Sequence, residues 1–459
     1  MESNTENSKS SAEILIRAEQ WDQLRPLLAS LHPADIAELI ESAPERQRAG
    51  IFELLDDETR ADVLSELDDT VEETLLEALS PQTISDIVEE MAPDDAADVL
   101  GDMDDDRSET ILNLLPAEDS EDVRELLSYE ADTAGGIMTT DFVALPRHKT
   151  AREALDHIGA LELEEPLHFT YVVDESGQLC GYVQLWKMLK AGNQARTLAE
   201  LAETELFFAH TDTDQEEVAR MMSKYDLSSL PVLDGSNRLV GRVTIDDVVD
   251  VIQEEASEDI FKLAGSSDDE LEYASPFLAS RARLPWLLIT LGTGLVTSMI
   301  LKAFMHRITS MEVIALSFFV PIVMAMGGNT GIQSSTLIIR GLAVGSFNGR
   351  NLYRVFLREM VTGMIMGGIC GTAIGFWAHF VIGASTTYHP VFLAVAVGLA
   401  LFSAMMFAAT FGAFVPLLLN RCKFDPAVAS GPFVTASNDI IALLIYYGIT
   451  LLLISVLPA

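Results

Sequence analysis

The stretch SGPFVTASNDIIALLIYYGITLLLISVLPA, residues 430–459, is apolar enough to cross a bilayer and contains a single carboxylate, Asp439. Long apolar sequence follows Asp439, so this side chain is predicted to lie at membrane depth. A carboxylate buried in a membrane is costly and usually marks an ion or proton path. It also fits a structural role, as a cap or hydrogen-bond acceptor at a broken helix. Asp439 is therefore a candidate ion site.

Residues 281–459 are predicted to form a membrane domain of five spans. The candidate spans are 284–305, 313–341, 352–382, 390–419 and 428–457. The three other acids of this region, Glu312, Glu359 and Asp425, are expected near segment ends. Basic residues flank the spans unevenly, eight on the side of the N-terminal half and two on the other. By the positive-inside rule the N-terminus is cytoplasmic and the C-terminus lies outside.

Several spans contain more glycine and polar residues than an inert anchor needs. The second predicted span contains Pro321 and the string 327–331, GGNTG, and the fifth opens with Gly431-Pro432. Irregular backbone at membrane depth is tolerated only beside protein or a wet cavity, so these two spans are expected to be broken and to line a cation path. Glycines at 363, 367, 371 and 375 are expected to let another helix pack closely.

Charge divides the chain into two halves. The net charge is −41, yet residues 281–459 carry ten Lys/Arg and only four Asp/Glu. Residues 1–280 are therefore strongly acidic. An acidic domain repels nucleic acid and anionic lipid and attracts cations. Adaptation to high salt would give the same composition. The three cysteines are far apart and predict neither disulfides nor a zinc site, and the polar N-terminus predicts no signal peptide.

Two internal repeats organise the acidic half. In residues 12–130, Glu38, Asp62 and Asp86 recur at intervals of 24 residues, each before an aliphatic pair. A period of this size predicts stacked helix pairs in a small superhelix. The second repeat pairs YVVDESGQLCG, residues 171–181, with PVLDGSNRLVG, residues 231–241. Each copy predicts a strand, a turn, a strand and then a helix.

The second repeat resembles a tandem CBS pair, a module that usually senses ligands and often binds adenosine nucleotides. The resemblance associates nucleotide binding with a Thr-x-x-Asp at the final strand. The second copy has Thr244 and Asp247, whereas the first has Lys187 where the acid would stand. ATP is therefore a candidate ligand, but the lysine in the first copy makes nucleotide binding there doubtful.

A run of acids follows the CBS pair. Asp247, Asp250, Glu254 and Glu258 share one helical face, where like charges destabilise an isolated helix. Such runs are usually solvated surfaces, but this helix directly precedes the first membrane span. A divalent cation bridging these acids to the helical domain would relieve the repulsion.

With these features in the same order, nearly the whole chain resembles the MgtE family of magnesium channels. The specific strings are EADTAGGIMT at 130–139, TDTDQEEVAR at 211–220, GGNTG at 327–331 with Gln333-Ser334, and Asn438-Asp439. The implied fold is a multidomain membrane protein with an α-helical superhelical N domain, an α/β CBS pair and an all-α, five-helix transmembrane domain. The expected boundaries are 1–134, 135–250, 251–280 for a connecting or plug helix with its linker, and 281–459.

The resemblance also implies partners and sites. It implies a homodimer in a bilayer, with the pore on the two-fold axis, Mg²⁺ as transported and regulatory ion, and no enzymatic activity. Asp439 would hold hydrated Mg²⁺ beside the Thr435 backbone, and Asn329, Gln333 and Asn438 would line the pore. Asparagine often stands in this family where the chain has Ile332 and Gly431. The regulatory metal sites implied are Asp62, Asp94, Asp98, Asp214, Glu216, Asp226, Asp247, Asp250, Glu255, Glu258 and Asp259.

These features predict a Mg²⁺-selective channel for passive uptake in the cell membrane, closed when Mg²⁺ binds its acidic cytosolic domains. No phosphate-binding GxxxxGK[ST] motif is present, which favours passive flow. The alternative is a secondary exchanger that couples a divalent cation to protons, with His379 the nearest further titratable group. An anion channel would need basic residues at midplane, and a membrane enzyme would need a nucleophile–base pair. The sequence shows neither.

Overall fold

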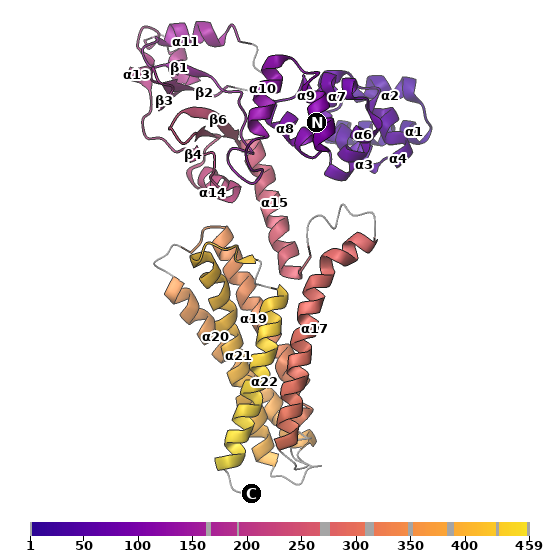
Figure 1. Cartoon of the computed structure of the whole chain (residues 1–459), viewed down its shortest axis with the longest axis vertical. Coiled ribbons are helices and arrows are strands. Elements are labelled where there is room, and N and C mark those ends of the chain that lie inside the picture. Colours follow the sequence, from indigo (N-terminus) through magenta and orange to yellow (C-terminus); the bar gives the residue numbers. More distant parts are fainter. Residues whose placement is uncertain are drawn as a thin grey trace. The chain divides into compact units, whose positions relative to one another are not determined.

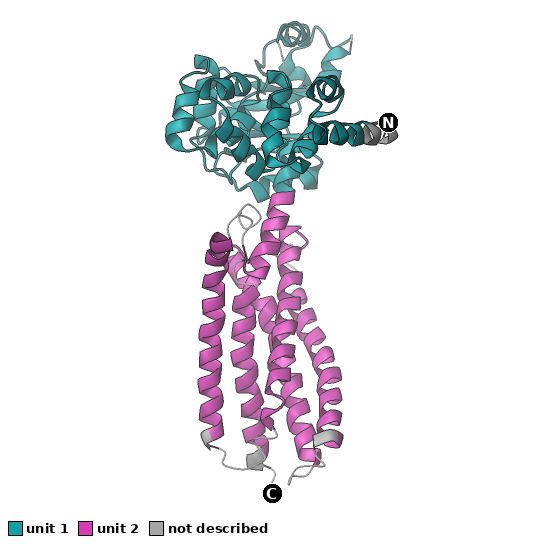
Figure 2. Cartoon of the chain, turned by 90° about the vertical axis from the view of Figure 1, so that its right-hand side faces the viewer, with its two compact units in different colours: residues 1–252 teal, residues 253–459 magenta. Residues whose placement is uncertain are grey.

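The computed structural model describes residues 2–161, 167–190, 192–266, 276–307, 316–347, 352–382, 390–427 and 431–456. The chain divides into two compact units, residues 1–252 and 253–459 (Figure 2). The first contains a helical domain and two small sheets, and the second contains the long apolar helices (Figure 1). Helix α15 (Ile245–Ala264) runs across the division between them.

The helical domain repeats every 24 residues, which confirms the period predicted from the sequence. The alternate helices α3 (Pro33–Ser42), α5 (Asp57–Leu64), α7 (Pro81–Val88) and α9 (Asp105–Leu112) pack in succession. The helices between them are α4 (Glu45–Phe52), α6 (Asp69–Ala78), α8 (Pro93–Gly101) and α10 (Ala117–Leu126), and α1 (Glu2–Arg17) and α2 (Trp21–Leu28) precede the series.

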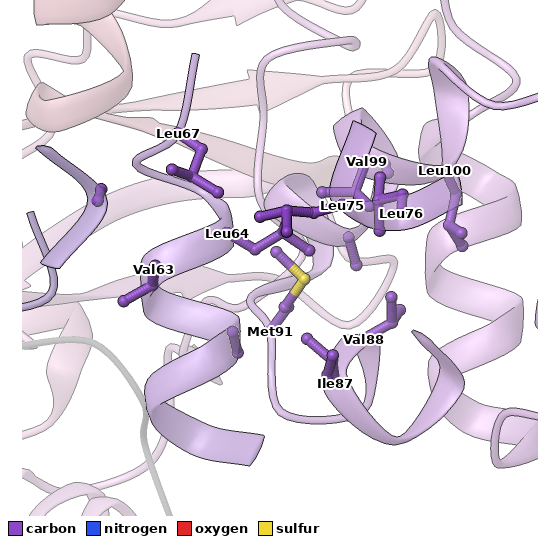
Figure 3. Close-up of a cluster of buried hydrophobic side chains, with 14 of the residues drawn as sticks. Val63, Leu64, Leu67, Leu75, Leu76, Ile87, Val88, Met91, Val99 and Leu100 are labelled. Carbon is purple, nitrogen blue, oxygen red and sulfur yellow. The ribbon is translucent and has the colours of Figure 1, made fainter. Parts of the chain in front are cut away.

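Local capping chemistry sets where these short helices begin. Pro33, Pro81 and Pro93 each lie in the first helical turn, where the missing N–H is not needed. Asp56 caps α5 by accepting from the Thr59 amide at 3.1 Å. The aliphatic pairs of each repeat then meet in one core, in which Leu64, Leu75 and Met91 converge (Figure 3).

The CBS-like repeat forms two matching three-stranded sheets. In the first, β1 (Ala144–Pro146) runs parallel to β2 (Phe169–Val173), which pairs antiparallel with β3 (Leu179–Gln184). The second has β4 (Ala209–His210), β5 (Ser229–Leu233) and β6 (Leu239–Thr244) in the same order. The accompanying helices are α11 (Ala151–Ile158), α12 (Leu185–Leu189), α13 (Leu198–Leu201) and α14 (Gln215–Tyr225).

The paired residues of this repeat have structural roles. Asp174 accepts from the amides of Ser176 and Gln178 at 2.8 and 3.0 Å, and Asp234 makes the same turn with equivalent amides. A side chain at Gly181 would come within 2.7 Å of the Glu203 carbonyl oxygen. A side chain at the matching Gly241 would lie 2.9 Å from the Thr139 carbonyl oxygen. The sequence repeat therefore reflects a turn and a close backbone contact that occur in both copies.

The second unit contains long helices. They are α17 (Pro276–Arg307), α19 (Val320–Ala343), α20 (Leu352–Trp377) with the π-helical turn η1 (Ala378–Ile382), α21 (Pro390–Arg421) and α22 (Gly431–Val456). Within the described residues, all but α19 are long and apolar enough to span a membrane. Helix α19 is more polar because it carries Asn329, Thr330, Gln333 and two serines.

The second predicted span is interrupted, as expected, because a turn at Phe318-Phe319 separates the helical residues 316–317 from the start of α19 at Val320. The expected break at GGNTG is wrong, since α19 is continuous through it, and the fifth span is also unbroken over the described residues of α22. Their glycines serve packing instead. A side chain at Gly412 of α21 would overlap the Gly331 carbonyl oxygen of α19. The four-residue glycine ladder of α20 also packs on a neighbour, as expected. A side chain at Gly371 would lie 2.5 Å from the Gly398 carbonyl oxygen of α21.

Candidate cation site

Asp439 lies in a cavity between α19 and α22. The cavity has a volume of about 430 Å³ and is lined by Val320, Pro321, Met324, Ala325, Gly328, Asn329, Thr435 and Asp439. Thr435 and Asp439 are one turn apart on α22 and therefore share a face. Gly328 of α19 lies close to both residues, because a side chain there would be 3.3 Å from the Thr435 Cγ2 atom and 3.6 Å from the Asp439 Oδ1 atom.

The Asp439 carboxylate is half-buried, and within the described residues it has no hydrogen-bond or ion-pair partner. The neighbouring Thr435 hydroxyl donates to the Gly431 carbonyl oxygen at 3.0 Å. Thr435 also lines the cavity. An unpaired carboxylate in an apolar bundle is costly, and the polar side chains beside it in the lining, Asn329 and Thr435, both carry oxygen atoms. This is the chemistry that Mg²⁺ and its bound waters prefer.

The three residues predicted to line a pore occupy different places. Asn329 is exposed and lines the Asp439 cavity, and Gln333 is exposed one turn further along α19. Asn438 does not line this cavity. Only 1% of it is exposed, and its amide lies against Gly331. The reason is helical rotation of about 100° per residue, which turns Asn438 into the bundle when Asp439 faces the cavity.

Glu359 is a buried acid that the sequence analysis did not single out, because it was expected near a segment end. It lies in the second turn of α20 and is 7% exposed. Its Oε2 accepts from the Ser334 hydroxyl of α19 at 3.0 Å, and Arg358 Nε is 3.4 Å from its Oε1. Ser334 is a polar residue on the face of α19 opposite the cavity, and its presence in an apolar segment is the sequence feature that could have indicated a buried polar partner such as Glu359.

The C-terminal end of α15 packs against the beginning of α22 within the second unit. A side chain at Gly431 would overlap the Leu263 carbonyl oxygen, and one at Gly265 would lie 2.9 Å from Pro432. This contact explains why glycine stands at 431. Pro432 is on the same helix as Thr435 and one turn before it, so α15 touches α22 close to the cation cavity.

An ion-pair cluster holds the same end of α15. Lys262 Nζ lies 2.8 Å from Asp425 Oδ2 and also pairs with Glu258. Burial lowers the pKa of Lys262, but hydrogen bonds to these two carboxylates outweigh it and the pKa is raised. Burial, followed by the nearby Asp425 carboxylate, raises the pKa of Asp259. Glu258 and Asp259, both predicted metal ligands, therefore lie beside a lysine and a third acid.

Several predicted regulatory ligands have local structural roles. Asp214 caps α14 by accepting from the Glu216 amide at 3.0 Å, and Asp226 ends that helix in the left-handed region at φ 53°. Asp247 accepts from the Thr244 amide at 3.2 Å and from the Thr244 hydroxyl. Burial raises the pKa of Asp247 and also that of Asp250.

The remaining predicted ligands differ in exposure. Asp62 and Asp98 are exposed, Asp94 is buried, and Glu255 is half-buried. In the part of the chain that the structure describes, no three His, Cys, Asp or Glu side chains gather as a metal site would require. The structure therefore leaves the regulatory sites as predictions.

Glu72 is a half-buried acid of the helical domain with several acidic neighbours. Burial, followed by the carboxylates of Asp102, Asp69, Asp98 and Asp95, raises the pKa of Glu72 to about 8. The folded domain therefore holds a proton that the unfolded chain releases. The contribution of Glu72 to the stability of the folded domain is fully present below its unfolded pKa of about 4.5. This contribution is lost as the pH rises through the folded pKa of about 8.

Replacing this carboxylate tests that repulsion. We expect Glu72→Gln to stabilise α6 by about 1–3 kcal/mol at pH 8 in chelator, and by much less at pH 5. Hydrogen–deuterium exchange of residues 69–78 in the purified full chain measures the difference. Glu77→Gln is the matched control, because Glu77 is exposed on the same helix. Equal stabilisation at both pH values would show that Glu72 is not strained by its neighbours.

Comparison with known proteins agrees with the order of these parts. Residues 320–449 match a family of divalent cation transporters, MgtE, and residues 31–132 match the MgtE intracellular N domain. Residues 134–193 and 198–254 match CBS domains. The magnesium transporter MgtE of Thermus thermophilus is 42% identical over 334 residues, which is 72% of each chain. The chain belongs to the MgtE family.

The chain is also similar to a second curated transporter and to solved structures of cytosolic domains. The magnesium transporter of Bacillus subtilis is 37% identical over 71% of this chain and 70% of its own. Among solved structures, the soluble part of a magnesium transporter is 30% identical, covering 55% of this chain and 99% of that one, with a TM-score of 0.49. The cytosolic domain of the Mg²⁺ channel MgtE in complex with ATP is 35% identical, covering 52% and 99%, with the same TM-score.

The MgtE match covers the helices that form the cation cavity. Residues 320–449 include α19, α20, α21 and the part of α22 that carries Thr435 and Asp439. Membership of a magnesium transporter family accords with a carboxylate-containing cavity in a bundle of long apolar helices. It confirms the family resemblance and the fold class drawn from the sequence.

Proposed function

We propose that this chain forms a Mg²⁺-selective channel that takes up Mg²⁺ passively. The observation that carries the proposal is the Asp439 carboxylate, which lines a cavity between two membrane helices without a cationic partner among the described residues. Mg²⁺ gives up its waters reluctantly, so a selective site can hold the hydrated ion with carboxylate and hydroxyl oxygens. The cavity of about 430 Å³ has room for an ion with its waters.

The proposed assembly is a homodimer whose pore lies on the two-fold axis. The cavity is an open recess in one chain, and a second copy would supply its other wall together with a second Asp439. Two carboxylates match the charge of one divalent cation. With the N-terminal half in the cytoplasm and the C-terminus outside, the membrane potential favours uptake by roughly 4.6 kcal/mol per Mg²⁺ at 100 mV.

The proposed regulation is closure by cytosolic Mg²⁺. Burial and then neighbouring carboxylates raise the pKa of Glu72, and a divalent cation bound among these acids would relieve the part that is due to repulsion. Carboxylate oxygens are ligands that Mg²⁺ accepts, and acids of the domains 1–134, 135–250 and 251–280 would hold it by coming together in the closed state. Because the end of α15 contacts Gly431 and Pro432, a change in α15 would reach the helix that carries Asp439. Mg²⁺ must bind the closed state more tightly than the open state.

Flux into liposomes tests the proposal. We expect Mg²⁺ influx that follows an imposed voltage, is unaffected by a proton gradient or protonophore, and falls as Mg²⁺ on the side of the N-terminal half is raised. Flux that instead required a proton gradient would favour the exchanger. Flux indifferent to Mg²⁺ on that side would refute the closure mechanism and leave the channel itself standing.

A further inference from the structure

A second cavity lies along α20, η1 and α21 and shares no residue with the Asp439 cavity. It is an open groove of about 530 Å³. Its lining contains no lysine, arginine, aspartate or glutamate, and its polar side chains are Thr372 and His379. Ion transport as proposed above makes no use of it.

The floor of the groove is largely backbone. At Gly367 a side chain would lie 2.8 Å from the Phe402 carbonyl oxygen, and the ladder glycine Gly371 is equally close to α21. These positions are closed by helix packing. Gly368, on the open side, differs: a side chain there would meet nothing within 4 Å among the described residues. The groove is therefore a hollow beside the helix contact, separate from the contact itself.

Aromatic residues form one wall. Phe376 and Phe380 stack with ring centroids 6.1 Å apart and an interplanar angle of 12°. They are 62% and 67% exposed, so the groove opens outwards. The backbone changes to the π-helical turn η1 at Ala378, and His379 packs edge-on against Phe380 at 4.7 Å. Both α20 and α21 are apolar enough to span the membrane, so an opening between them that no protein covers would face hydrocarbon.

The polarity, length and volume of the groove limit what can bind in it. Water is excluded from a recess that offers so few polar groups at membrane depth. From Gly367 to His379 the groove runs about 18 Å at 1.5 Å per residue, close to the roughly 15 Å of half a bilayer core. A volume of about 530 Å³ is in the range of sites for small ligands, whereas a partner helix is about 10 Å across. The dimensions match one extended hydrocarbon chain.

We infer that the groove is a binding site for one acyl chain of a membrane phospholipid, with its glycerol end beside His379. The chain would bridge α20 and α21 and stabilise their pairing by covering apolar surface between them. Because no basic side chain lines the groove, neutral and anionic headgroups should bind equally well.

Photo-crosslinking tests the site. The full chain is placed in nanodiscs with a phosphatidylcholine or phosphatidylglycerol that carries a diazirine in its acyl chain, and labelled peptides are mapped by mass spectrometry. We expect label on residues 367–402 with either headgroup. Gly368→Phe, which fills the groove, should reduce this label at least five-fold. Gly292→Phe is the matched control, because a side chain at Gly292 also meets nothing within 4 Å in the described chain.

A thermal measurement gives a second readout. Added phosphatidylcholine should raise the unfolding temperature of the detergent-solubilised wild type and of Gly292→Phe, and should raise that of Gly368→Phe far less. Gly368→Leu replaces the phenylalanine variant if the latter does not fold. Undiminished label in a folded Gly368 variant would overturn the inference. So would the absence of label from residues 367–402 in the wild type, which would mean that protein covers the groove.

Discussion

Asp439→Asn is expected to reduce Mg²⁺ influx into liposomes by at least about 100-fold. The substitution keeps the size of the side chain and removes its charge. A divalent ion about 4–5 Å from a carboxylate gains several kcal/mol at an effective dielectric constant near 20, and a loss of about 2.7 kcal/mol lowers occupancy 100-fold. Influx is measured with a Mg²⁺-sensitive dye inside the vesicles at an imposed negative potential.

The controls for Asp439→Asn separate charge from folding. Asp439→Glu restores the charge and should recover part of the flux. Asn329→Ala, in the wall of the same cavity, removes an uncharged contact and should cost much less. The unfolding temperature of each variant shows whether the bundle is intact. A folded Asp439→Asn protein that transports Mg²⁺ at the wild-type rate would refute the proposed ion site.

Gly412→Ala is expected to destabilise the helix bundle by about 3 kcal/mol and to lower the yield of monodisperse protein. The added methyl group would overlap the Gly331 carbonyl oxygen and would lie 3.0 Å from the adjoining carbonyl carbon. Backbone cannot move aside as a flexible side chain can, so α19 and α21 must separate. Because Gly328 and Asn329 are within one turn of Gly331, the cation cavity should also be distorted.

Thermal unfolding in detergent, followed by size-exclusion chromatography, measures this effect. Gly448→Ala is the matched control, since a side chain at Gly448 meets nothing within 4 Å in the described residues. It should leave the unfolding temperature unchanged or slightly higher, because alanine favours the helix. If Gly412→Ala were as stable as Gly448→Ala, close contact of α19 and α21 would not limit the stability of the bundle.

Sequence periodicity predicted the parts of the fold that repeat. The 24-residue interval of Glu38, Asp62 and Asp86 reflects helix pairs that each bury one aliphatic pair, and the turns at Asp174 and Asp234 need the same side-chain chemistry twice. Asp439 could be found because an isolated charge in apolar sequence is conspicuous, and the structure places it in a cavity.

Other features depend on packing that sequence does not encode locally. GGNTG was expected to break a helix. The glycines of α19 remain helical because α21 and α22 pack closely against them, where a larger side chain would not fit. Asn438 and Asp439 are adjacent in sequence, and only the rotation of α22 decides which one faces the cavity. Glu359 was assigned to a segment end because its partner, Ser334, is on another helix.

The unbroken course of α22 has a mechanical consequence. Pro432, which α15 touches, and Asp439 belong to one straight run of helix with no hinge between them. These two residues are separated by about two turns of helix, so a displacement of one end of this segment also displaces the other end. A small shift of α15 where it contacts Pro432 would therefore move the Asp439 carboxylate.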